Sequence, residues 1–191
     1  MKPIDRHVLY GLWITAGYSA EVSQEWKEWA RSRFVSPYLR NTLWDMGYAL
    51  DTLESAVPWS MFEQARVNTL AGIRSTLEAE GVGGHAFSHL SHLYTDGAGF
   101  YITYIFPRSE DPEGTLSTWR AVKRSACESI LAGGGTISHQ HGVGLDHRDA
   151  LPGEKSRAGM QLIRAVAQAV DPAGVLNPGK LIAVDPPEPS L

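Results

Sequence analysis

The sequence contains a single cysteine, Cys127, among its 191 residues. One cysteine cannot form a disulfide within the chain, so the fold has to be held together by its hydrophobic core, as is usual in a reducing cytoplasm. Cys127 lies in a stretch with helical periodicity, where we expect a small buried residue. The cysteine content therefore excludes a disulfide scaffold and favours a cytoplasmic protein.

Long apolar runs and an excess of basic residues are also missing. No stretch approaches the roughly 18 consecutive apolar residues that a membrane-spanning helix needs, and the first six residues lack the apolar segment of a signal peptide. With 17 basic and 21 acidic residues the formal net charge is −4, which gives no basic surface for nucleic acid. We therefore expect neither a membrane span nor a nucleic-acid partner.

The residues that are present are typical of one globular domain with an attached arm. Hydrophobic residues make up 43% of the chain and charged residues 20%, which is an ordinary balance. We place an N-terminal arm and helix over residues 1–33, the main domain over residues 34–182 and a disordered tail over residues 183–191. The proline-rich tail cannot join a sheet.

Hydrophobic periodicity predicts alternating strands and helices. We expect helices over residues 21–33, 36–46, 60–81, 115–132 and 154–170, and strands over residues 48–57, 84–93, 99–106 and 136–138. Ser36 before Pro37 predicts one helix start, and a capping box from Ser60 to Glu63 predicts another. The order of elements over residues 48–138 predicts an α+β fold, in which helices cover an antiparallel sheet with ferredoxin-like elements.

The apolar stripes of the three long helices predict which side chains face the core. These are Phe62, Val67, Leu70, Ile73 and Leu77 in the first, Leu116, Trp119, Val122, Ala126 and Ile130 in the second, and Met160, Ile163, Val166 and Ala167 in the third.

A segment rich in glycine and histidine, GGGTISHQHGVG over residues 133–144, is the most distinctive in the chain. Glycine allows the backbone to approach a ligand closely, and imidazole is readily tuned to transfer protons near neutral pH. Residues two apart in an extended segment point to the same side, so His139 and His141 would face one volume, with Gln140 on the other side. The spacing fits a proton-transfer site, and it fits a glycine-rich hairpin end whose histidines only form hydrogen bonds.

The same segment resembles the histidine-rich loop of the FAD-linked oxidase C-terminal (cap) domain, in the vanillyl-alcohol-oxidase-type flavoprotein superfamily. It is most similar to the alkyldihydroxyacetonephosphate synthase branch, where the loop reads S-H-H-H-G-V-G. Three further blocks agree in order and spacing: SPYLR at residues 36–40, YTDGAGFY at residues 94–101, and VDP through LNPGK at residues 170–180. The resemblance covers roughly residues 34–182.

The resemblance implies roles for five side chains. Tyr101 lies in an aromatic run that otherwise predicts a packing residue, but the resemblance makes it the catalytic acid or base, tuned by His139 and His141. Arg40 reads by itself as a solvated arginine on a helix, whereas the resemblance makes it the group that binds a phosphate or carboxylate of the substrate. Tyr94 is implied to belong to the substrate pocket.

The turn at residues 177–180 is ordinary by sequence. The resemblance implies that it leads the chain back toward a flavin domain, so Asn177, Gly179 and Lys180 become candidate contacts to FAD.

Seven histidines raise the question of a metal ion. His85, His89 and His92 are close in sequence, but in a regular strand His85 and His89 share one face and His92 takes the other. Three ligands from one short strand cannot easily surround a metal.

The resemblance also bears on metal binding. Related D-2-hydroxyacid dehydrogenases of the superfamily bind a metal through two histidines and a glutamate, and the corresponding positions here are Tyr94, Tyr101 and Gln140. None of these is a good ligand for a divalent ion, so we expect no tightly bound metal and no simple 2-hydroxyacid dehydrogenase. Gln140 also replaces a histidine of the synthase branch, which distinguishes this chain from that branch.

A phosphate cradle for FAD is missing from the sequence. Such a cradle is usually a glycine-rich turn that leads into a helix, whereas Gly133–Gly135 precede a predicted strand. The resemblance implies that a separate flavin-binding domain or subunit holds FAD. We therefore expect this chain to be half of a flavoenzyme, as a truncated chain, the product of a split gene or a stand-alone remnant.

We interpret the chain as the substrate-binding and catalytic cap of an FAD-dependent enzyme, and a homodimer is compatible with it. The resemblance implies a small anionic or lipid-like substrate and an exchange of acyl for alkyl groups, as in the synthase branch. Two alternatives stay open: the cap of a flavin-dependent alcohol or 2-hydroxyacid dehydrogenase, and a non-catalytic binding module that has lost its cofactor.

Overall fold

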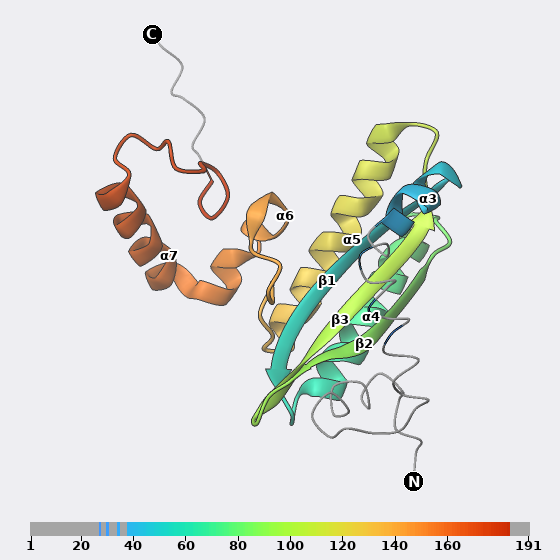
Figure 1. Cartoon of the computed structure of the whole chain (residues 1–191), viewed down its shortest axis with the longest axis horizontal. Coiled ribbons are helices and arrows are strands. Elements are labelled where there is room, and N and C mark those ends of the chain that lie inside the picture. Colours follow the sequence, from blue (N-terminus) through green and yellow to red (C-terminus); the bar gives the residue numbers. More distant parts are fainter. Residues whose placement is uncertain (1–26, 28–29, 31–33, 35–37, 184–191) are drawn as a thin grey trace.

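The computed structural model describes residues 27, 30, 34 and 38–183. The predicted Ser36 cap and the tail from residue 184 lie outside the described residues, as does most of the predicted helix over residues 21–33. The described elements are, in order, α3 (Leu39–Asp45), β1 (Tyr48–Pro58), α4 (Phe62–Ala79), β2 (His85–Leu93), β3 (Gly97–Pro107), α5 (Pro112–Ala132), α6 (Gly144–Arg148) and α7 (Leu151–Val170) (Figure 1). None of these helices is both long and apolar enough to cross a membrane.

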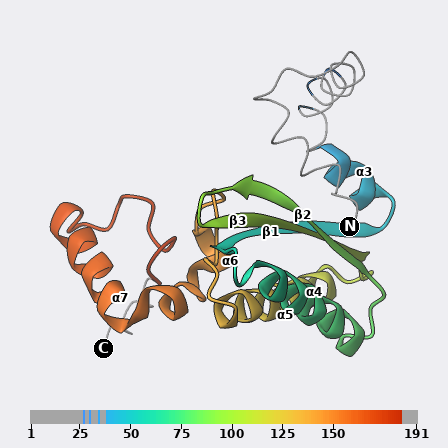
Figure 2. The ribbon, with the colours of Figure 1, turned by 90° about the horizontal axis from the view of Figure 1, so that it is seen from below.

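The three strands form one antiparallel sheet in the order β1-β3-β2. Helices α4 and α5 lie side by side on one face of this sheet, and α3 lies beyond the other face at one end (Figure 2). The α+β prediction and all three long strands are therefore confirmed. The sheet has one covered face and one face that α4 and α5 leave open.

The covered face forms the main core because the strands alternate apolar residues toward the helices. Leu53 of β1 and Phe100, Ile102 and Tyr104 of β3 are fully buried there. Cys127 of α5 belongs to the same core, as its sequence position predicts, and burial raises the pKa of its thiol to about 11. This thiol is therefore a packing group and not a nucleophile.

Three predicted core positions are wrong, because Val67, Leu116 and Val166 are 44%, 39% and 55% exposed. In α5 the buried stripe runs through Thr115 and Thr118 instead, so threonines fill positions that a purely apolar pattern overlooks. In α7 only a narrow stripe around Met160 is covered, and this helix projects away from the sheet (Figure 1).

Two predicted helix starts also differ. The Ser60 capping box does not form: α4 begins at Phe62, and its N-cap residue Met61 makes no side-chain cap. A tight turn places Met61 N–H on the carbonyl of Pro58, which leaves Ser60 outside the first helical turn. Helix α5 begins earlier than predicted, because Asp111 accepts a hydrogen bond from the Glu113 N–H and caps it.

The predicted strand at residues 136–138 is not formed as a regular strand. The segment still runs antiparallel along the free edge of β1: Thr136 N–H donates to the Ala56 carbonyl at 3.4 Å, and His139 N–H donates to the Glu54 carbonyl at 3.0 Å. Two such bonds are too few for a ladder, but they place the histidine-rich segment beside the sheet.

A polar network ties the covered face of the sheet to α5. The Asp51 carboxylate accepts hydrogen bonds from Lys123 Nζ at 2.9 Å, Trp119 Nε1 at 2.7 Å and Tyr104 Oη at 3.2 Å. Burial alone would raise the pKa of Asp51, but the Lys123 charge and the hydrogen bonds from Trp119 and Lys123 outweigh burial, so the pKa lies below its usual value. The Lys123 side chain is only 6% exposed, so each charge depends on the other.

We expect Lys123→Met to destabilise the protein by about 3 kcal/mol at pH 7, because it leaves a largely buried carboxylate without its cation. The depressed pKa of Asp51 gives stability that is present above its unfolded value of 3.8 and is lost as pH falls through the folded value. The difference in the free energy of unfolding between wild type and Lys123→Met, measured by urea unfolding, should therefore narrow below pH 3.8. Arg124→Met, at an exposed position of the same helix, is the control; a gap that is constant with pH would contradict this account.

Candidate functional site

A row of polar side chains crosses the middle of the open sheet face. Glu54 of β1 pairs with Tyr101 of β3, and Tyr101 pairs with His89 of β2. Residues that pair directly in an antiparallel sheet point to the same side. The three side chains therefore form one line across the face that α4 and α5 do not cover.

A β-bulge adds His92 to this face. The register of β2 shifts between Leu90 and His92, so that His92 pairs with Gly99 and not with a residue of the covered face. Gly99 and Tyr101 are two residues apart in β3, so they face the same side of the sheet. Because His92 pairs with Gly99 and His89 pairs with Tyr101, His92 points to the same side as His89. The prediction that His92 takes the opposite face is therefore wrong, because one extra residue reverses the alternation.

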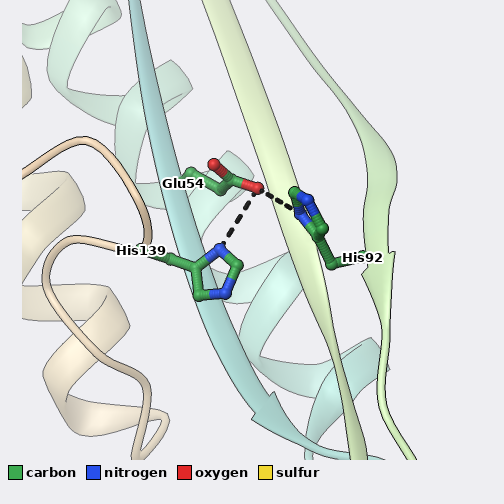
Figure 3. Close-up of side chains that lie close together, drawn as sticks. All are labelled: Glu54, His92 and His139. Atoms are coloured by element: carbon green, nitrogen blue, oxygen red, sulfur yellow. Dashed lines mark hydrogen bonds and ion pairs between the residues drawn. The ribbon is translucent and has the colours of Figure 1, made fainter.

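The segment after α5 brings two more histidines onto the same carboxylate. Glu54 Oε1 lies 3.1 Å from His92 Nδ1 and 3.3 Å from His139 Nδ1, and Glu54 Oε2 lies 3.3 Å from His141 Nε2. Figure 3 shows His92 and His139 approaching the carboxylate from two sides. His139 and His141 thus face one volume, as their spacing predicts.

Glu54 is only 4% exposed, although it lies on the open face. Burial raises the pKa of this carboxyl, but hydrogen bonds from Ser91, His139 and His92 outweigh burial and hold the pKa below its usual value. The group is therefore ionised at neutral pH. A buried carboxylate needs compensating charge or hydrogen bonds, and the imidazoles supply them.

Aromatic side chains surround these groups. Tyr94 Oη lies 2.7 Å from His139 Nε2. The Tyr101 ring stacks on His89 with centroids 5.1 Å apart and meets the edge of His141 at 5.3 Å. We call this group the Glu54 cluster, with members Glu54, His89, His92, Tyr94, Tyr101, His139 and His141.

The structure brings together four of the site residues that the sequence predicts, namely Tyr94, Tyr101, His139 and His141. Arg40 is exposed on α3, near the Tyr48 end of β1, and no hydrogen bond or ion pair among the described residues joins it to the cluster. The catalytic and binding roles of all these side chains stay predictions.

The candidate cofactor residues after α7 lie apart from the sheet (Figures 1 and 2). The Gly179 carbonyl accepts a hydrogen bond from Arg148 Nη1 at 3.0 Å, which ties this segment to α6. Asn177 and Gly179 have φ of 49° and 78°, in the left-handed region that a tight turn requires. A contact of Asn177, Gly179 or Lys180 with FAD stays a prediction.

Sequence reasoning missed Glu54 and misplaced His92. Carboxylates are depleted in strands, so a glutamate within YALDTLESAVP was a usable signal for a site. No comparable signal marks the bulge at His92. The metal-free expectation weighed the strand histidines and the family positions Tyr94, Tyr101 and Gln140, and did not consider Glu54.

The glycines that precede the cluster allow close packing. A Cβ at Gly135 would lie 2.5 Å from Ser55 Oγ, and a Cβ at Gly133 would lie 2.9 Å from Ala65 Cβ. These glycines therefore let the segment approach β1 and α4, and their backbone does not form a cradle for a dinucleotide.

The family comparison matches residues 10–181 to FAD linked oxidases, C-terminal domain. Among curated proteins, alkyldihydroxyacetonephosphate synthase of Dictyostelium discoideum is 27% identical over 156 residues, which cover 82% of this chain and 25% of that protein. The same enzyme of Trypanosoma brucei brucei is 25% identical, with 96% and 30% covered. Mitochondrial D-lactate dehydrogenase [cytochrome] 1 of Saccharomyces cerevisiae is 30% identical, with 73% and 22% covered.

A solved structure of alkyldihydroxyacetonephosphate synthase has the same fold, with a TM-score of 0.57 and 22% sequence identity. The match covers 81% of this chain and 25% of that one. The chain thus spans between about a fifth and a third of the length of the relatives described here.

We expect Glu54→Gln to lower the free energy of unfolding by about 1–3 kcal/mol at pH 7, because the amide cannot replace a charged acceptor shared by three imidazoles. Urea unfolding of the purified chain measures the change. Glu110→Gln removes an exposed carboxylate outside the cluster and should change stability by less than about 0.5 kcal/mol. Equal effects of the two substitutions would show that Glu54 does not organise the cluster.

Proposed function

Because this chain belongs to the family of FAD linked oxidases, C-terminal domain, we propose that it is the substrate-binding and catalytic cap of an FAD-dependent enzyme. Its open sheet face would close over the ring of FAD held by a separate flavin-binding domain or subunit. The observation that carries the proposal is the convergence of His139 and His141 on the buried carboxylate of Glu54, with the Tyr101 ring packed against His141.

Tyr101 is the proposed acid or base. Its ring lies between His89 and His141 in the middle of the open face, where a substrate can reach it. FAD, when bound, supplies an electron-accepting ring, and Tyr101 moves a proton to or from the substrate carbon. A general acid or base has to lie within hydrogen-bond reach of the reacting group, directly or through one water.

The histidines support Tyr101 through Glu54. The carboxylate lies 3.3 Å from His141 Nε2, so it holds in place the imidazole that packs in a T-shaped arrangement with Tyr101. Tyr94 orients His139 from the opposite side through its 2.7 Å contact with Nε2. Glu54 and Tyr94 are therefore positioning residues, and Tyr101 is the residue that exchanges the proton.

The described residues suit the ring of FAD better than its phosphates. The open face carries the polar cluster and exposes it on one side, whereas Gly133 and Gly135 are packed against α4 and β1. A partner domain would thus bind the dinucleotide, with Asn177, Gly179 and Lys180 as candidate contacts from this chain. Exposed apolar residues of the C-terminal segment provide surface for such a partner, among them Leu162, Val170, Val175 and Leu176.

The substrate in this proposal is small and carries a phosphate or carboxylate, with a lipid-like portion in the synthase-type reaction. Arg40 would bind the anionic group from the end of the sheet, because guanidinium keeps its charge and forms paired hydrogen bonds to phosphate or carboxylate. The similarity to curated alkyldihydroxyacetonephosphate synthases supports a reaction of that type, which uses flavin without net oxidation.

A second candidate is oxidation of a hydroxyacid. The 30% identity to D-lactate dehydrogenase [cytochrome] 1 of yeast favours it. The two candidates differ in whether substrate turnover reduces the flavin, so the absorbance of oxidised flavin under anaerobic turnover separates them.

We expect Tyr101→Phe to lower kcat by about 10²–10⁴-fold in the flavin-containing enzyme, because the phenol that exchanges the proton is removed. The flavin spectrum should be unchanged. Tyr48→Phe is the matched control, since Tyr48 is exposed on β1 and lies outside the cluster. Activity of Tyr101→Phe equal to that of Tyr48→Phe would reject the catalytic assignment.

We also expect this chain alone to bind FAD weakly, because its glycines are packed and not arranged around phosphates. The purified chain should elute colourless from gel filtration after incubation with FAD. A flavin absorption band retained near one FAD per chain would reject the need for a separate flavin-binding domain or subunit.

A further inference from the structure

We propose that Glu54, His92 and His139 form a binding site for a divalent transition-metal ion, with zinc favoured by the ligand types. The three ligands come from β1, β2 and the segment after α5, so they surround one volume, which three histidines of a single strand cannot do. The inference replaces the metal-free expectation, which rested on Tyr94, Tyr101 and Gln140. It rests on ligand geometry and does not depend on the proposed reaction.

The spacing of the Glu54 oxygen from each of the two histidine nitrogens matches a tetrahedral ion. One ligand atom from each residue lies within 4.8 Å of the other two. Glu54 Oε1 is 3.1 Å from His92 Nδ1 and 3.3 Å from His139 Nδ1. Zinc bonds of about 2.0–2.1 Å at tetrahedral angles place neighbouring ligand atoms about 3.3 Å apart. The side chains therefore need little movement to accept the ion.

The imidazole ring of His139 has the orientation that is typical of a metal-binding histidine. Tyr94 Oη lies 2.7 Å from its Nε2, which leaves Nδ1 directed at Glu54. This Nδ1 is buried and lies 3.3 Å from Glu54 Oε1. Metal-binding histidines characteristically use the second ring nitrogen for a hydrogen bond that fixes the ring. Tyr94 is thus the outer partner of the proposed ligand His139.

The charge of the three ligands and the access to them also fit a bound metal ion. The Glu54 carboxylate is buried, and a bound dication would compensate it more completely than one protonated imidazole does. With three protein ligands, a fourth position stays free for water or substrate, as in catalytic zinc sites. His141 and Tyr101 lie beside the three ligands on the same face. The site is therefore placed to polarise an oxygen of a molecule bound there.

The test titrates the purified chain, stripped with a chelator, with zinc chloride in calorimetry at pH 7.5. Cobalt(II) provides a second probe, because a tetrahedral site gives an intense visible absorption. We expect one ion per chain, a raised Tm with zinc, and at least 100-fold weaker binding in His92→Gln and His139→Gln. His85→Gln is the control, since His85 is exposed on the same strand and is not one of the three ligands.

Two further variants separate this inference from the proposed function. Tyr94→Phe should weaken zinc binding by about 10–100-fold, because it removes the outer partner of His139. Tyr101→Phe should leave zinc affinity unchanged, although it is expected to abolish most turnover. Failure of the metal site therefore leaves the assignment of Tyr101 intact, and failure of that assignment leaves the metal site intact.

Imidazole NMR signals of the wild-type chain, followed during the titration, keep the test decisive if a ligand variant fails to fold. Zinc should shift the signals of His92 and His139 at one equivalent and leave His85 unchanged. Absence of one-to-one binding would overturn the proposal. Equal affinity in His92→Gln, His139→Gln and His85→Gln would overturn it as well.

Discussion

The ionised carboxylate of Glu54, buried on the open face of the sheet, is the constraint on which the site depends. A buried carboxylate is costly unless nearby charges or hydrogen bonds compensate it. The pKa of Glu54 lies below its usual value, which is the direction that such compensation gives. Compensation comes from segments that are far apart in sequence: His92 from β2 and two histidines from the segment after α5. One charge therefore holds three parts of the chain against the same face.

Strand β1 carries two carboxylates that point to opposite faces of the sheet, the buried Glu54 and the half-buried Asp51. Asp51 faces α5 and pairs with the buried Lys123, so this pair ties the strand to the helix. Glu54 faces away from the helices and pairs with three imidazoles. The same need for compensation thus produces an ion pair on one face and a cluster of histidines around a carboxylate on the other, where we propose proton exchange and metal binding.

The sequence predicted the α+β fold and the three long strands because their apolar alternation is strong and local. It also predicted that His139 and His141 face one volume. It did not predict the partner of these histidines, because Glu54 is recognised as central only when the segment after α5 is placed along β1. His92 was assigned to the wrong face because one extra residue in the bulge reverses the alternation of side chains along β2. Leu116 was assigned to the core because an apolar pattern overlooks the threonines that form the buried stripe of α5.

The position of the histidine-rich segment follows from a packing requirement as much as from hydrogen bonds. Gly133 and Gly135 touch α4 and β1 so closely that a side chain would not fit at either position. Their contact brings His139 N–H within 3.0 Å of the Glu54 carbonyl, so the backbone of the same residue that supplies the carboxylate also anchors the imidazole. Two constraints therefore set the distance between His139 and the carboxylate. One is the close packing of Gly133 and Gly135, and the other is the hydrogen bond from the backbone of His139 to the backbone of Glu54. A proton and a metal ion would compete for the same nitrogen and oxygen lone pairs within this fixed gap.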